Sequence, residues 1–83
     1  MNYFVYLITT KIKKKIISYV GYTNNLKKRL NLHNSSKGAK FTKGKKWKVI
    51  YFKIYNSKRK AMIEEYKLKK NYKLRNKIKY GVK

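Results

Sequence analysis

The sequence predicts a small α/β (α+β) domain with the element order β-β-α-β-α-α. Three short runs are rich in β-branched and aromatic residues, and three further segments space their apolar residues as helices do. With 83 residues, of which 42% are apolar, the chain has room for one domain, 1–83. Its sheet and its helices must therefore share one core.

The first two strands are expected to form a hairpin. The run Tyr3–Ile8 is continuously apolar, which is typical of a strand buried on both faces. A polar, Lys-rich turn over Thr9–Lys15 would join it to a second strand, Ile16–Tyr22. Gly21 within that strand predicts the close approach of another group. The third strand is expected over Trp47–Tyr55.

The helices are expected to begin at polar capping residues. They would run from Thr23 or Asn24 to Asn34, from Asn56 or Ser57 to Lys70, and from Asn71 to Lys79, with Gly81 as a stop. The segment between the first helix and the third strand, Ser35–Lys46, shows no periodicity and is expected to be a basic loop.

Charge is the strongest compositional signal. The chain holds 25 Lys and Arg residues against two acidic ones, a net charge of +23. An AT-rich genome would enrich Lys, but it would not deplete Asp and Glu, whose codons are also rich in A and T. Such a charge disfavours a compact state unless a polyanion relieves the repulsion. Nucleic acid is the polyanion that this charge favours, and an anionic membrane surface is the weaker alternative.

The composition also indicates where the protein works. It has no Cys, so neither disulfides nor thiolate metal sites are available, which favours a reducing, cytoplasmic (intracellular) environment. No segment is long and apolar enough to span a membrane, so no membrane partner is expected. Without Cys or Asp, cysteine-type and serine-type nucleophilic sites are excluded.

Two helices carry candidate site residues. With Leu26 and Leu30 facing inward, Arg29 and His33 project together from the border between core and solvent. Spacing alone favours an ordinary explanation for both, in which the Arg stem covers the core and the His finds a backbone partner.

The second helix places a carboxylate among apolar residues. Its apolar arc is predicted to hold Ala61, Met62, Tyr66 and Leu68, with Glu65 in the middle. An inward carboxylate is costly unless it is paired or binds metal. The alternative, that Glu65 turns outward to Lys69, has equal weight. Glu64 is expected to form a solvated ion pair near Lys60 and Lys67.

Several of these segments resemble motifs of the GIY-YIG nuclease superfamily, in the same order. Phe4-Val5-Tyr6 and Tyr19-Val20-Gly21 are similar to degenerate forms of its two signature triplets, with Phe4 in place of the usual Gly. Residues 33–42 (HNSSKGAKFT) resemble the H-x-S-G-K-G-A-K-Y-T block of small stand-alone bacterial members. Residues 61–70 resemble the glutamate-bearing helix of that group.

The resemblance implies a three-stranded antiparallel sheet flanked by helices, and a role for each of five side chains. Glu65 would bind one divalent ion, Mg²⁺ or Mn²⁺, and Arg29 would hold the scissile phosphate. Tyr6 and Tyr19 would position or deprotonate the attacking water, and His33 would support them. Gly21 would be a structural residue near the site.

The leading hypothesis is therefore a divalent-metal-dependent DNA endonuclease, structure-selective or weakly sequence-selective, of the kind used in DNA repair. The alternative is a non-catalytic nucleic-acid-binding module on the same fold. The expected partners are DNA or RNA and a protein that supplies targeting, with the chain itself a monomer. Contacts to nucleic acid are expected from the basic loop, at Lys37, Lys40, Phe41, Lys43, Lys45 and Lys46.

Overall fold

The computed structural model of the protein describes residues 2–35, 37, 40–42 and 44–80. The elements are β1 (Tyr3–Ile12), β2 (Lys15–Thr23), α1 (Leu26–Asn34), the 3-10 turn η1 (Lys40–Thr42), β3 (Lys48–Tyr55), α2 (Lys58–Lys70) and α3 (Tyr72–Lys79). This sequence of elements confirms the predicted order β-β-α-β-α-α. The turn η1 adds structure to a segment in which only a loop was expected.

The sheet has the strand order β2-β1-β3, and both pairings are antiparallel. The first strand is therefore the central one, and its residues 5–9 are buried. This confirms that the continuous apolar run at the N-terminus is a strand covered on both faces. It also leaves β2 and β3 as the two edges of the sheet.

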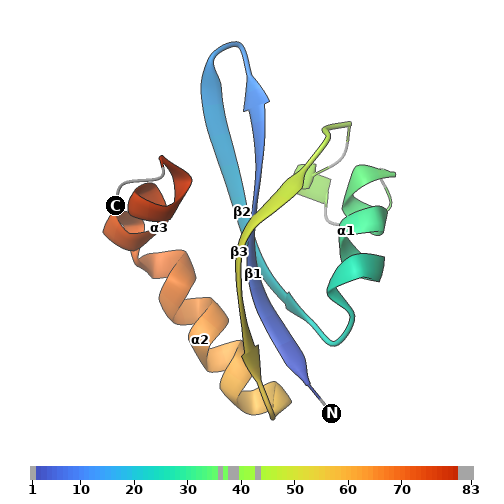
Figure 1. Ribbon diagram of the computed structural model, residues 1–83, viewed down its shortest axis with the longest axis vertical. Helices are drawn as coiled ribbons and strands as arrows, with labels where there is room; N and C mark the ends of the chain where they lie inside the picture. Colours follow the sequence, from blue (N-terminus) through green and yellow to red (C-terminus); the bar gives the residue numbers. More distant parts are fainter. Residues whose placement is uncertain (1, 36, 38–39, 43, 81–83) are drawn as a thin grey trace.

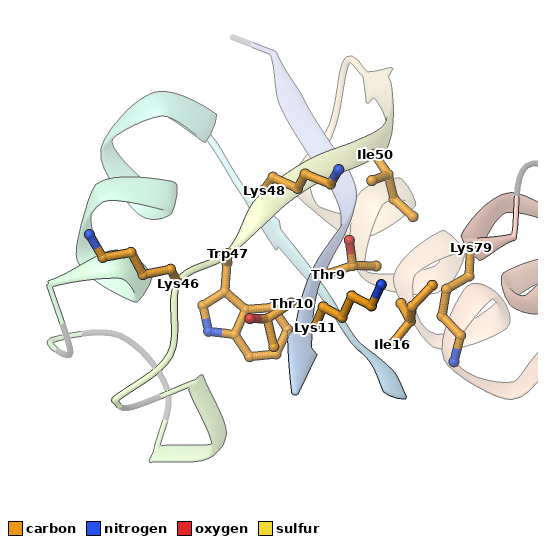
Figure 2. A pocket seen from close by; sticks show the side chains of 9 residues that line it. All are labelled: Thr9, Thr10, Lys11, Ile16, Lys46, Trp47, Lys48, Ile50 and Lys79. Carbon is orange, nitrogen blue, oxygen red and sulfur yellow. The ribbon is translucent and has the colours of Figure 1, made fainter. Parts of the chain in front are cut away.

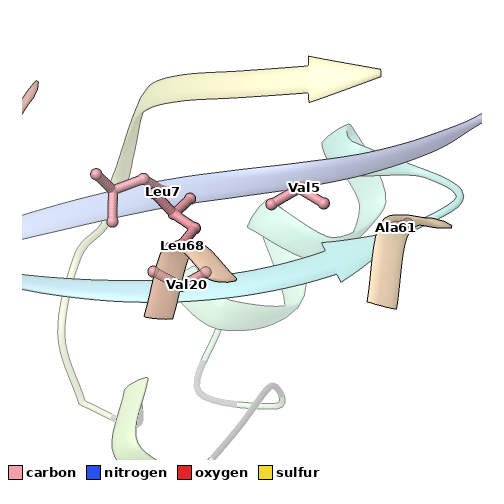
Figure 3. Packing of buried hydrophobic residues seen from close by; sticks show 5 residues of the cluster. All are labelled: Val5, Leu7, Val20, Ala61 and Leu68. Atoms are coloured by element: carbon pink, nitrogen blue, oxygen red, sulfur yellow. The ribbon is translucent and has the colours of Figure 1, made fainter. Parts of the chain in front are cut away.

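The single core expected for the sheet and helices is wrong, because successive side chains of β1 point to opposite faces and enter two separate cores. Val5 and Leu7 pack with Ala61 and Leu68 of α2, as Figure 3 shows. Tyr6 and its neighbours on the other face pack around Trp47 and the apolar side of α1. In Figure 1, α2 and α3 accordingly lie on one side of the sheet and α1 on the other.

The predicted turn Thr9–Lys15 is wrong in extent. Cross-strand pairing continues to Ile12 and Lys15, and only Lys13 and Lys14 form the turn. Both turn residues have positive φ, 47° and 70°, the two-residue geometry that matches the twist of the flanking strands. Lysines indicated a loop, but the backbone ladder continues independently of these polar side chains.

Each helix begins at a side-chain cap. Asn25 caps α1 by accepting a hydrogen bond from the backbone N–H of Lys28, one or two residues later than predicted. Ser57 caps α2, as predicted, and Asn71 caps α3. The predicted stop at Gly81 lies outside the described residues.

The predicted inward arc of α2 is partly wrong. Ala61 and Leu68 are buried, but Met62 and Tyr66 are about half exposed. The helix meets the sheet along a narrow stripe, so side chains about 100° away from it remain in solvent. Lys70 Nζ lies 4.8 Å from the centre of the Tyr66 ring, which gives the exposed ring a cationic cover.

Candidate active site

A cavity of about 330 Å³ lies at the β2 edge of the sheet, where residues from both faces meet. It is lined by Tyr6, Tyr19, Gly21, Tyr22, Arg29, His33, Lys37 and Glu65. The four predicted catalytic residues, the predicted metal ligand and the nearby glycine are all in this set. They come from β1, β2, α1 and α2, so folding gathers residues that are up to 59 positions apart, from 6 to 65, around one space.

Tyr6 reaches the cavity by crossing over Gly21, its cross-strand partner on β2. A Cβ on Gly21 would collide with the hydroxyl and ring of Tyr6. The close approach that Gly21 predicted is therefore the Tyr6 side chain itself. A strand residue without a side chain allows an aromatic ring from the central strand to extend to the edge of the sheet.

His33 is buried and has two side-chain partners. Its Nε2 lies 2.9 Å from the Tyr6 hydroxyl, and its Nδ1 lies 2.8 Å from Oγ1 of Thr42. A neutral imidazole has one donor and one acceptor nitrogen, so both are satisfied in this arrangement. The ordinary explanation, a backbone partner for His33, is wrong, because two hydroxyl groups take that place.

Thr42 is fully buried, and its backbone is bonded to Trp47. The indole N–H of Trp47 donates to the Thr42 carbonyl at 3.0 Å. The backbone of Trp47 is bound in turn by the Asn34 side chain, which donates to its carbonyl and accepts from its N–H. The end of α1, η1 and the start of β3 thus form one bonded unit around His33.

Burial raises the pKa of the Tyr6 hydroxyl well above its usual range, and Tyr19 raises it further, whereas Arg29 opposes the shift. Tyr6 is therefore a neutral phenol at neutral pH. Burial, and then the Arg29 guanidinium, lower the pKa of His33 below its ordinary value of 6.5. A neutral tyrosine thus faces a neutral histidine across a short hydrogen bond.

Tyr19 and Arg29 also line the cavity. The Tyr19 ring meets the His33 ring edge-on, with 5.2 Å between the ring centres. Arg29 is half-buried on α1, one turn before His33, as the helical spacing predicted. Arg29 and Lys37 are the two cations among the lining residues, and they give the cavity a positive wall suited to an anion.

Glu65 lines the cavity with 17% of its side chain exposed, and it also pairs with Lys69 at 3.5 Å. The two arrangements expected for this residue, inward and paired with Lys69, therefore coexist. Glu64 forms the predicted ion pair with Lys67 at 3.3 Å. It lines a different cavity, beside Tyr55, and does not reach the Tyr6 site.

The predicted nucleic-acid-binding residues do not all lie at this cavity. Lys37 lines it, and Phe41 is half exposed with its ring stacked on Tyr19 at 6.1 Å. Lys45 Nζ donates to the Phe41 carbonyl at 3.1 Å, which ties the loop to itself. Lys46 lines another groove, together with Trp47 and Lys48 (Figure 2). The Lys40 side chain and Lys43 lie outside what the structure describes.

Sequence reasoning missed two residues of the site, Tyr22 and Thr42. Tyr22 lines the cavity from the α2 side of the edge strand, where only its neighbour Gly21 was considered. Thr42 ends the ten-residue block that resembles small bacterial GIY-YIG proteins, but nothing in its spacing connects it to His33. Its place at the end of that block, which begins with His33, was the one signal in the sequence that could have connected the two residues.

The family model of the GIY-YIG catalytic domain matches residues 2–79. The chain belongs to the GIY-YIG family. This match confirms the resemblance carried by the two triplets and the block at 33–42. A nuclease-type function on a nucleic-acid substrate follows for the family, and GIY-YIG nucleases generally depend on a divalent metal.

Curated relatives of this GIY-YIG chain are bacterial UPF0213 proteins. One from Clostridium perfringens is 44% identical over 84% of this chain and 72% of its own length. One from Oceanobacillus iheyensis is 50% identical over 61% of this chain, and one from Bacillus subtilis is 41% identical over 83%. The matches span only 60% of the Oceanobacillus protein and 68% of the Bacillus protein.

A solution NMR structure of a UPF0213 protein from Bacillus halodurans is 36% identical to this chain. The alignment covers 83% of this chain and 71% of that protein, with a TM-score of 0.45. Within the part of the chain that the structure describes, no helix is both long and apolar enough to cross a membrane.

The donor groups of this GIY-YIG site fit one hard divalent cation and not two. Among the described residues no group of three His, Asp, Glu or Cys side chains gathers to hold a metal. Glu65 is the one carboxylate on the cavity. Mg²⁺ commonly takes one or two carboxylates and completes its shell with water and phosphate oxygens, so a single Glu fits it.

Proposed function

We propose that this chain is a divalent-metal-dependent DNA endonuclease that hydrolyses phosphodiester bonds with structural or weak sequence selectivity. One observation carries the proposal. Tyr6, Tyr19, Arg29, His33 and Glu65, which come from four elements, line a single cavity at an open edge of the sheet. An edge site is accessible to a polymer, which a closed pocket would exclude.

Each side chain has a role that its position supports. Glu65 would hold Mg²⁺ or Mn²⁺, which supplies Lewis-acid stabilisation of phosphate charge when bound. Arg29 would bind the scissile phosphate through its planar, permanently charged donors. Lys37 would add a second positive charge at the same wall.

The pair of Tyr6 and His33 would take up the proton of the attacking water. The proton would move from water to the Tyr6 hydroxyl oxygen as the Tyr6 proton moves to Nε2 of His33, 2.9 Å away. The lowered pKa of His33 keeps Nε2 free to accept at neutral pH, and the imidazolium formed would donate from Nδ1 to Thr42. Tyr19 would orient the water from the adjacent strand.

A second function is favoured by the ion pair between Glu65 and Lys69. If Lys69 holds this carboxylate permanently, the domain binds nucleic acid without cutting it. Both functions share the same basic surface, and both predict binding dominated by phosphate contacts. Only three of the 25 basic residues are Arg, so few side chains can make bidentate hydrogen bonds to base edges.

The experiment that tests the proposal is nicking of DNA by the purified chain. Supercoiled plasmid and labelled branched, single-stranded and duplex DNA are incubated with Mg²⁺, with Mn²⁺ and with EDTA. The proposal expects strand cleavage that requires the metal and differs among the DNA forms. Binding without cleavage of any form in either metal would overturn it in favour of the binding module.

A further inference from the structure

The β1–β2 hairpin extends past the rest of the sheet. Pairing between β1 and β3 stops at Thr9 and Lys48, whereas pairing between β1 and β2 continues to Ile12 and Lys15. Residues 10–17 therefore form a two-stranded ribbon with no third strand beside it. Figure 1 shows this ribbon projecting beyond the helices. We refer to residues 10–17 as the hairpin arm.

The hairpin arm carries four lysines at its end. Lys11, Lys13, Lys14 and Lys15 are all exposed, and the arm contains no acidic residue. Isoleucines at 12, 16 and 17 are half-buried, so the ribbon has a partly apolar body and a cationic tip. A ribbon of this kind presents its charge away from the molecule.

Neither turn geometry nor composition explains lysine at both turn positions. Lys13 and Lys14 have φ of 47° and 70°, in the left-handed region where Asn and Gly are favoured. A left-handed conformation is unfavourable for a residue that carries a Cβ, because the Cβ comes too close to the following carbonyl oxygen. Asn codons are as AT-rich as Lys codons, and Asn is abundant in this chain, so coding bias does not select Lys here. The two lysines therefore occupy turn positions that other residues would fill with less strain.

The positive surface continues into a groove at the base of the arm. This groove, of about 380 Å³, lies where β1 passes the start of β3. Lys11, Lys48 and Lys79 enter it from β1, β3 and α3, as Figure 2 shows. The groove shares no lining residue with the Tyr6 cavity, so it is a separate feature of the surface.

We propose that the hairpin arm is a second DNA-binding element that enters the major groove of a B-form duplex. The major groove admits a two-stranded ribbon, whereas the deep, narrow major groove of A-form RNA does not. From Tyr19 back to Lys14, at the tip of the arm, the chain advances five residue steps, which span roughly 17 Å at the rise of a strand. At about 3.4 Å of duplex per base pair, the tip would contact the duplex about five base pairs from the point nearest Tyr19 in the Tyr6 cavity.

This inference rests on the proposed function for its substrate, but it is tested by binding alone. The test variant is Lys13→Asn/Lys14→Gly, which removes two charges and supplies the residues that the turn geometry favours, so the fold is expected to be at least as stable. The control is Lys58→Gln/Lys60→Gln, which removes two exposed charges from the start of α2. Thermal unfolding of all three proteins checks the fold.

Affinity for a DNA duplex of about two helical turns is measured in EDTA over a range of salt concentrations. The proposal expects the arm variant to bind about tenfold more weakly, with a salt slope lower by about 1.8 for two lost phosphate contacts. The control should bind within about twofold of wild type. Equal losses in the two variants, or an equal loss of double-stranded RNA binding in the arm variant, would overturn the proposal.

Nicking by the wild type is scored separately, with metal present. A wild type that binds through the arm but does not nick would overturn the proposed nuclease and leave the arm in place. If the wild type nicks DNA and the arm variant binds duplex as tightly as the wild type, the proposed arm is overturned and the proposed nuclease stands. A wild type that does not bind duplex DNA would overturn the arm as well.

Discussion

The Tyr6 hydroxyl lies 2.9 Å from Nε2 of His33, and both side chains are buried. This bond joins the central strand to α1 across the edge strand, and Gly21 is the residue that leaves room for it. Position 6 and position 33 depend on each other in this arrangement, because each satisfies a buried polar atom of the other. The site is therefore part of the folded core as well as a surface for chemistry.

Tyr6→Phe should abolish most of the activity and lower stability. The substitution leaves Nε2 of His33 buried without a partner, which costs about 1–3 kcal/mol in the free energy of unfolding. Losing the group that would transfer the proton should slow nicking at least about 10²-fold. Denaturant unfolding and nicking rates are compared with those of Tyr55→Phe, which lies on the other side of the sheet. Unchanged nicking in Tyr6→Phe would remove this residue from the mechanism.

Gly21→Ala should displace the Tyr6 ring, because the added methyl group occupies its path. Overpacking of this kind costs about 1–3 kcal/mol. The cost should shrink when Tyr6 is shortened, so a double-mutant cycle with Tyr6→Leu isolates the contact. The stabilities of the two single variants and the double variant are measured by denaturant unfolding. Additive effects would show that Gly21 is required for a different reason.

Stability should fall as the pH is lowered through the ordinary pKa of histidine. His33 titrates below 6.5 in the folded protein, so below pH 6.5 the unfolded chain binds a proton that the folded chain does not. The free energy of unfolding should therefore decrease from pH 6.5 down to the folded-state pKa and then level out. The slope is at most about 1.4 kcal/mol per pH unit.

His33→Gln removes the titrating group and should flatten this dependence. The chain has no other His and only two acidic side chains, so few other groups contribute between about pH 5 and 7.5. The melting temperatures of wild type and His33→Gln are measured across this pH interval and compared. An equal dependence in both proteins would mean that His33 is not the group responsible.

Local periodicity predicted the elements of this fold well, and the pairing of distant residues less well. Arg29 and His33 were placed on one edge of α1 because helical spacing fixes their relation. Helical spacing could not predict the hydrogen-bond partners of His33, because Tyr6 lies 27 residues away and Thr42 lies in a segment without periodicity. The family resemblance, read from the order of the motifs, brought Tyr6 and His33 into one site.

The errors have physical causes of a similar kind. Met62 and Tyr66 were expected inside because they are apolar, but α2 contacts the sheet along a stripe too narrow to cover them. The Lys-rich segment from Thr9 to Lys15 indicated a turn, but cross-strand backbone pairing extends through most of it. In both places tertiary packing and backbone pairing overrode the preference suggested by side-chain type.

The two glutamates test the central claim most directly, because they are neighbours on α2 with different surroundings. Glu65 lines the Tyr6 cavity, whereas Glu64 pairs with Lys67 beside another one. Glu65→Gln preserves the shape of the side chain but removes the charge that would hold Mg²⁺, whereas Glu64→Gln makes the same change outside the site. DNA binding in EDTA and the melting temperature serve as controls for both variants.

The measurement is Mg²⁺-dependent nicking by wild type, Glu65→Gln and Glu64→Gln. We predict that Glu65→Gln loses nicking while it still binds DNA, because the lost charge belongs to the reaction and not to the basic surface. Glu64→Gln should nick within a few-fold of wild type. An active Glu65→Gln beside an inactive Glu64→Gln would contradict this account of the metal-binding residue.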